Sequence, residues 1–352
     1  MPSQSPRLVD VLPGLALAVL VGLSARVVHN YLPTQLASAL GEVIFAVLIG
    51  LIVGNIGPLP LTLAPGIRFS FQTVLRAAIV LLGAAFSFQQ VLAIGGKAVG
   101  MIVILMSLAL TAAHLLSRLA GVPGRLATLI GVGTAVCGNS AIVATAPVIR
   151  ARDEEVSFAV ATNTLFGTLA VLLYPVIGRL LHFGDAQFGT WVGTAVNDTS
   201  QVVAAGFAYS DAAGRLATAV KLTRNALMGL VIVGVGLAYA RAGAATKAPG
   251  DGWARFQQSF PLFVIGFLAM ALVNSLGGLR WLSGVIGHDV GSILRETSRA
   301  MILVALAGVG LSTRLQAMRR TGWKPFAIGF AVAALTSGAS LLLIHFLGPA
   351  SG

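Results

Sequence analysis

The sequence contains little charge and a single cysteine, Cys137. Only 10% of its 352 residues are Asp, Glu, Lys or Arg. One cysteine excludes a disulfide within the chain and any cysteine-based zinc cluster. The five histidines are scattered without metal-ligand spacing, and no glycine-rich run ends in Gly-Lys-Ser or Gly-Lys-Thr. We therefore expect no metal ion, no cofactor and no ATP-binding loop.

Hydrophobic residues, in contrast, make up 57% of the chain. They gather in runs of about 18 to 25 residues, the length that crosses the hydrocarbon core of a bilayer. Lipid offers no partners to backbone polar groups, so only helices and closed barrels span it. These runs are apolar on all sides, whereas barrel strands alternate apolar and polar residues. The sequence therefore predicts an all-α integral membrane protein, with the lipid bilayer as a partner.

The apolar runs predict about eleven transmembrane helices in one transporter domain that covers 1–352. They lie at 8–28, 36–54, 73–88, 98–119, 126–149, 156–181, 191–207, 216–239, 260–276, 286–311 and 325–346. The net charge of +12 comes from basic residues scattered near helix ends, which indicates topology signals and not a nucleic-acid partner. Their excess on one side predicts a bacterial inner-membrane protein with a cytoplasmic N-terminus and an external C-terminus.

The two halves of the chain resemble each other in three places. Glu42 aligns with Asp198, Arg76 aligns with Arg224, and the Gly-Val-Gly at 131–133 aligns with that at 308–310. The matches occur in the same order, although chance similarity between apolar helices is an alternative explanation. They predict a repeat of five helices at 36–181 and a second at 189–347, with 8–28 as an extra helix. Five is odd, so the second repeat is inverted, as in many secondary transporters.

A glycine-rich stretch in each predicted repeat favours a broken helix. Glycines in a helix interior are destabilising, and a break in lipid is tolerated only beside protein or a wet cavity. The new helix start, N-capped by Asn139 or Ser140, would offer free N–H groups to an anion. The alternative is close helix packing through small residues. The residues concerned are Gly131, Gly133, Cys137, Gly138, Asn139 and Ser140 in one stretch, and Gly308, Gly310 and Thr313 in the other.

Among the charged residues inside predicted membrane helices, four are candidates for a position near the bilayer centre: Arg76, Asp198, Lys221 and Arg224. Charge in the bilayer centre is costly, so such residues usually serve function. Three bases against one acid favour an anionic ligand. The alternative is a structural salt bridge between Asp198 and either Lys221 or Arg224.

Polar residues accompany these charges. The run 194–201, which includes Asn197, offers hydroxyl, amide and carboxylate groups and could unwind to line a cavity. Asn163 and Thr164 lie in an otherwise apolar helix and could face the same space. Hydrogen bonding between helices is an equally good explanation for them.

Three stretches resemble the YeiH-type sulfate exporter family, UPF0324: GVGTAVCGNSAIVATAPVI at 131–149, FGTWVGTAVNDTSQVVAAG at 188–206 and ATAVKLTRNALMG at 217–229. The resemblance implies a fold similar to sodium/proton antiporters and bile-acid symporters, with two discontinuous helices that cross in mid-membrane. It also implies export of sulfate or a related oxyanion. The family often has a histidine before the acid of the second stretch, where this sequence has Asn197 before Asp198. Proton coupling is then in doubt or moves to Asp198.

These observations predict a secondary transporter, not an enzyme, that exports a small inorganic or organosulfur anion. The alternative is a cation/proton antiporter that uses Asp198. A coupling ion, proton or sodium, and a homodimer are left open as partners. The predicted substrate-binding residues are Arg76, Cys137, Gly138, Asn139, Ser140, Asn197, Asp198, Lys221, Arg224 and Thr313.

Overall fold

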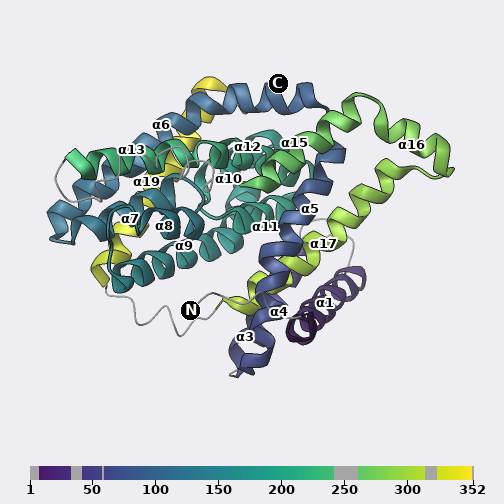
Figure 1. Cartoon of the computed structure of the whole chain (residues 1–352), viewed down its shortest axis with the longest axis horizontal. Coiled ribbons are helices and arrows are strands. Elements are labelled where there is room, and N and C mark those ends of the chain that lie inside the picture. Colours follow the sequence, from purple (N-terminus) through teal and green to yellow (C-terminus); the bar gives the residue numbers. More distant parts are fainter. Residues whose placement is uncertain (1–7, 33–41, 58, 242–260, 314–322, 351–352) are drawn as a thin grey trace. The chain divides into compact units, whose positions relative to one another are not determined.

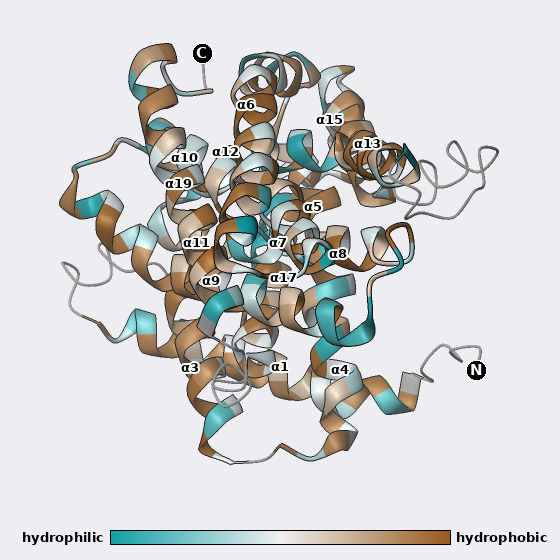
Figure 2. Cartoon of the chain, turned by 90° about the vertical axis from the view of Figure 1, so that its left-hand side faces the viewer, coloured by the Kyte–Doolittle hydropathy of each residue, from teal (hydrophilic) through white to brown (hydrophobic). Residues whose placement is uncertain are grey.

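The computed structural model describes residues 8–32, 42–57, 59–241, 261–313 and 323–350. Within these ranges every regular element is a helix, as the sequence predicts (Figure 1). Apolar residues cover most of these helices (Figure 2). The predicted helix starts at 36 and 260 lie outside the described residues.

Six described helices are long and apolar enough to cross a membrane. A seventh span is added if α15 (Leu262–Ser275) and α16 (Gly278–Ile286), bent by 70° at their junction, are counted together. The chain is therefore a multi-pass membrane protein, while the prediction of about eleven spans is not confirmed. The six spans are Val9–Asn30, Leu61–Ala85, Phe88–Ala120, Asp153–Leu180, Asp211–Arg241 and Lys324–Leu347.

The chain divides into two compact units. Unit 1 comprises 1–91, 207–211 and 263–315, and unit 2 comprises 92–206, 212–262 and 316–352. Each unit draws on both halves of the sequence, as interleaved repeats would. The inverted repeat itself stays a prediction.

Unit 1 is built from helices that cross very closely. It contains α1 (Leu8–Asn30), α3 (Glu42–Ile56), α4 (Ala64–Phe69), a π-helical turn at Ser70–Val74, α5 (Leu75–Leu82) and α17 (Val290–Ser312). Gly14 of α1 faces Gly66 of α4, and Gly50 of α3 faces Gly310 of α17. Small residues at these crossings let the backbones approach, a common device in membrane bundles.

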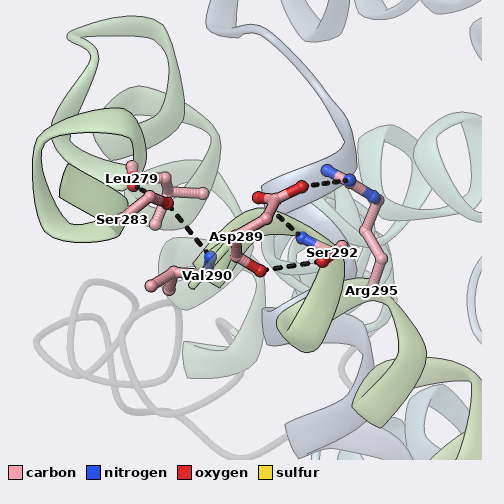
Figure 3. Close-up of polar contacts among 6 residues, drawn as sticks. All are labelled: Leu279, Ser283, Asp289, Val290, Ser292 and Arg295. Carbon is pink, nitrogen blue, oxygen red and sulfur yellow. Dashed lines mark hydrogen bonds and ion pairs between the residues drawn. The ribbon is translucent and has the colours of Figure 1, made fainter. Parts of the chain in front are cut away.

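The turn between α16 and α17 is held by side chains (Figure 3). Asp289 N-caps α17, because its Oδ1 accepts a hydrogen bond from the Ser292 backbone N–H at 3.2 Å. Arg295 forms an ion pair with the other carboxylate oxygen of Asp289 at 3.8 Å. On the α16 side, Ser283 Oγ accepts from the Val290 N–H at 3.0 Å. These bonds satisfy groups that a helix start would otherwise leave unpaired.

The second predicted helix break is wrong. Gly308 and Gly310 lie inside α17, which runs without interruption from Val290 to Ser312. A Cβ atom on Gly310 would collide with the Val47 carbonyl oxygen, and one on Gly308 with Ser70 Oγ. These glycines therefore serve close packing within unit 1, the alternative that the sequence left open.

Gly310→Ala is expected to lower the melting temperature of the detergent-purified protein. The new methyl group has only backbone to displace, and overpacking of this kind costs about 1–3 kcal/mol. The matched control is Gly338→Ala in α19 (Trp323–Leu347), where a Cβ atom meets nothing within 4 Å. Equal melting temperatures for the two variants would contradict the packing role of Gly310.

Unit 2 contains most of the remaining helices and both helix breaks. From residue 92 onward, α6 (Phe88–Ala120) packs in a core with α7 (Gly124–Ala135), α8 (Asn139–Thr145) and α9 (Asp153–Leu180). The other helices are α10 (Asp185–Ala195), α11 (Thr199–Tyr209), α12 (Asp211–Ala226), α13 (Met228–Arg241) and α19. Trp191 of α10 stacks on Tyr174 and donates to Ser337 Oγ of α19 at 3.0 Å, which positions α10.

Candidate functional site: two helix breaks around buried cations

The first break separates α7 from α8 within the predicted stretch 131–141. Gly131 and Gly133 remain helical, and the interruption falls at 136–138. Gly138 has a φ of +68°, a conformation that L side chains rarely adopt. It also occupies the N-cap position, so the predicted capping by Asn139 or Ser140 does not occur.

The second break separates α10 from α11 at 196–198, inside the predicted polar run. Asp198 Oδ1 accepts from the Ser200 backbone N–H at 2.9 Å and from Ser200 Oγ at 2.7 Å. Asp198 therefore caps the start of α11, where a carboxylate is favoured by the helix dipole. The second discontinuous helix is therefore formed by α10 and α11, and not by the segment around Gly308.

Lys221 of α12 ties the two breaks together. Its side chain is fully buried, and its Nζ donates to the carbonyl oxygens of Val136 at 2.7 Å, Val196 at 2.9 Å and Asn197. An ammonium group has three donors, so these bonds use all of them. Lys221 therefore has no donor left for a ligand, contrary to the predicted binding role.

Arg224, one helical turn further along α12, has the same kind of partners. Its Nε donates to the Ala135 carbonyl oxygen at 2.6 Å, and its Nη1 donates to those of Thr194 at 2.9 Å and Val196 at 3.2 Å. These carbonyls end α7 and α10, where a helix leaves acceptors unpaired and carries partial negative charge. Both cations thus cap helix C-termini. Among the residues described, neither forms a salt bridge with Asp198, which was the structural alternative to a binding role.

A network of amides surrounds the breaks. Asn139 of α8 donates to Thr164 Oγ1 at 3.0 Å and accepts from Asn163 Nδ2 at 2.9 Å. Gln201 of α11 donates to the Thr164 carbonyl oxygen at 3.2 Å. Asn163 and Thr164 of α9 therefore face the same space as the polar run, as the sequence suggested.

The structure gathers only part of the predicted site. Cys137 to Asn139 and Asn197, Asp198, Lys221 and Arg224 belong to unit 2, with Cys137 Sγ 3.1 Å from Met228 Sδ. Ser140 is exposed. Arg76 and Thr313 belong to unit 1, where Arg76 is exposed on α5 and Thr313 Oγ1 donates to the Val309 carbonyl oxygen at 2.9 Å.

Sequence reasoning missed Asn225. Its Nδ2 donates to Thr199 Oγ1 at 3.0 Å, and it is 2% exposed. The signal was available, because Asn225 directly follows Arg224 in a membrane helix and an amide there needs a partner as much as a charge does.

Gly138→Ala is expected to lower the melting temperature of the detergent-purified protein. A Cβ atom there would lie 2.7 Å from Asn163 Nδ2 and 3.2 Å from Asp198 Cβ, in addition to the strained φ. Gly121→Ala is the matched control, since Gly121 has a φ of +67° but nothing within 4 Å of its Cβ position. If both variants melt at the same temperature, backbone strain alone explains the effect at Gly138, and its close contacts with Asn163 and Asp198 do not contribute.

The fold and these breaks define a polytopic helical membrane protein with two discontinuous helices. The family model described as conserved hypothetical protein 698 matches residues 13–329. A UPF0324 membrane protein of Clostridium tetani is 32% identical, over 95% of this chain and 97% of the relative. One of Agrobacterium fabrum is 32% identical over 89% and 87%, and one of Streptococcus pyogenes serotype M6 is 34% identical over 90% and 92%. The chain belongs to the UPF0324 membrane protein family.

Proposed function

We propose that the protein is a secondary transporter, not an enzyme, that exports a small anion across the bacterial inner membrane by alternating access. Sulfate or a related sulfur oxyanion is the substrate class that we favour. The observation that carries this proposal is the capping of both interrupted helices by Lys221 and Arg224 at their carbonyl ends.

The electrostatic consequence supports an anion. Each break creates one negative carbonyl end and one positive N–H end. The two buried cations neutralise the carbonyl ends of α7 and α10. The N–H end of α11 keeps its partial positive charge, and Asp198 is the one carboxylate that caps it. Two cations against one carboxylate leave the cluster positive in a poorly solvated region, which favours a negative ligand. Lys221 and Arg224 would thus act through the helix ends and not as direct ligands.

The proposals on membrane orientation, direction of transport, coupling ion and oligomeric state rest on the sequence. The excess of basic residues on one side supports a cytoplasmic N-terminus and an external C-terminus. The direction of export rests on the resemblance to the sulfate exporter family. A proton or sodium coupling ion and a homodimer remain open.

A cation/proton antiporter is the second candidate. The observations that favour it are the carboxylate of Asp198 at the start of α11 and, elsewhere in unit 2, buried amide oxygens without a hydrogen-bond partner among the described residues, because hard cations prefer carboxylate and carbonyl oxygens. Such a transporter would need Asp198 to bind the cation with its charge.

Asp198→Asn separates the two candidates. Asparagine keeps the oxygen that caps α11 but removes the negative charge. For an anion transporter we expect affinity for sulfate or sulfite to rise by about 1 kcal/mol or more, since a repulsive charge is lost. The measurement is the ligand-induced shift in melting temperature of the purified protein.

The control ligand series is sodium chloride against choline chloride. Stabilisation by sodium in the wild type that disappears in Asp198→Asn, with no response to either oxyanion, would contradict anion transport and support the antiporter. The cap also explains why Asp198→Ala is a poor substitute, because it removes the charge and the capping oxygen together.

A further inference from the structure

One side of the span Leu61–Ala85 in unit 1 carries polar and charged side chains at helical spacing. Arg68, Gln72 and Arg76 follow each other at intervals of four residues; both arginines are exposed and Gln72 is partly exposed. Arg68 Nε donates a hydrogen bond to Gln72 Oε1 at 3.2 Å. These three side chains, the arginine stripe, lie along a helix that is long and apolar enough to cross a membrane.

The π-helical turn at Ser70–Val74 brings the two arginines into line. On a regular α-helix, side chains eight residues apart point about 80° away from each other around the axis. A π-helical turn holds more residues than an α-helical turn, so it removes most of this angle. Arg68 and Arg76 therefore emerge from nearly the same side of the span. Such turns are frequent at functional sites.

The opposite side of the span packs against other helices of unit 1. Gly66 faces Gly14 of α1, and Ser298 Oγ of α17 donates to the Ala78 carbonyl oxygen at 2.8 Å. Gly66 and Ala78 are buried, whereas the arginine stripe is open. The stripe thus faces away from both α1 and α17.

Arg76 stands near the middle of the span and forms no ion pair among the described residues. About 14 Å of helix separates it from the end of the span, in a hydrocarbon core about 30 Å thick. On α17, in contrast, Arg295 pairs with Asp289 and Arg299 with Asp211. A charge this deep is costly against lipid, and such side chains face protein or a water-filled cavity.

We propose that the arginine stripe lines a water-filled passage and holds the transported anion on its way through the membrane. Two guanidinium groups without a carboxylate partner among the described residues attract small anions and repel cations. Gln72 stands between them, and its amide nitrogen is a further donor for an anion's oxygen atoms, since its own oxygen already accepts from Arg68. This inference rests on the proposed anion transport and adds to it a second anion site, in unit 1.

Cysteine labelling in proteoliposomes tests the passage, because the native Cys137 is buried. Gln72→Cys and Arg76→Cys are treated on both sides of the membrane with two water-soluble methanethiosulfonates, one ending in a sulfonate and one in a trimethylammonium group. Each rate is divided by the rate of the same reagent with a free thiol. We expect both variants to react, and the sulfonate reagent to be favoured about tenfold in Gln72→Cys, which keeps both arginines. Adding Arg68→Gln should reduce this preference.

Leu20→Cys is the control, since Leu20 is 61% exposed within the apolar span Val9–Asn30 and should react with neither reagent. All three substitutions replace side chains that are not buried, and size exclusion checks that the variants fold. If Gln72→Cys and Arg76→Cys are as unreactive as Leu20→Cys, or react equally with both reagents, the inference is wrong, and sulfur-anion counterflow by the wild type would leave anion transport standing. Sulfonate-selective labelling without counterflow of any sulfur anion would overturn the proposed substrate and leave the passage standing.

Discussion

Lys221→Met is expected to destabilise the protein more than any other single substitution considered. The variant keeps the apolar stem but leaves three main-chain carbonyls, those of Val136, Val196 and Asn197, without their donor. Breaking a buried charged contact by removing one partner costs about 3–5 kcal/mol. The measurement is the melting temperature of the detergent-purified protein, followed by its monodispersity on size exclusion.

Lys97→Met is the control for loss of a lysine charge in a membrane helix, because Lys97 is exposed on α6. We expect it to melt close to the wild type. If Lys221→Met melts as high as Lys97→Met but binds no anion, Lys221 is a direct ligand and its capping role is wrong.

Arg224→Lys is expected to abolish anion transport although it preserves the charge. The guanidinium group bridges the end of α7 at Ala135 and the end of α10 at Thr194 and Val196, and a lysine has a single nitrogen for these separate positions. Unpaired carbonyls at one of the two ends cost about 1–3 kcal/mol each. The measurement is sulfur-anion uptake into proteoliposomes, beside the melting temperature of the same preparation.

Arg118→Lys, at the exposed end of α6, is the control for replacing an arginine by a lysine, and this variant should transport like the wild type. Full transport by Arg224→Lys would show that only the charge matters there. Full transport by both Arg224→Ala and Lys221→Ala would remove the basis of the proposed mechanism.

The break in the first glycine stretch could be predicted from sequence, but the uninterrupted helix through the second glycine stretch could not. The Gly-Val-Gly at 131–133 and that at 308–310 are identical, and neither itself interrupts its helix. At the first, α7 ends at Ala135, and the chain enters α8 through Gly138, which has a positive φ. At the second, the glycines face α3 and the turn at Ser70–Val74. Composition reveals small residues, whereas only tertiary contacts decide between a break and a close crossing.

The charged residues show the same limit. Lys221 and Arg224 were recognisable as costly charges in a membrane helix, but their partners are main-chain carbonyls, which no residue type signals. The sequence therefore suggested Asp198 as the partner, although Asp198 caps α11 through Ser200. Arg76 was paired with Arg224 by alignment, yet it lies exposed in unit 1 while Arg224 is buried in unit 2. A linear match carries no information on burial.

The central claim is that the protein moves a small sulfur anion, and counterflow in proteoliposomes tests it most directly. Vesicles loaded with unlabelled sulfate, sulfite or isethionate are diluted into a trace of the same labelled anion, with sodium and pH equal on both sides. The account predicts transient accumulation of label, absent from chloride-loaded vesicles and from vesicles with Arg224→Lys. No accumulation of any sulfur anion, together with a sodium-driven pH change that Asp198→Asn abolishes, would contradict it.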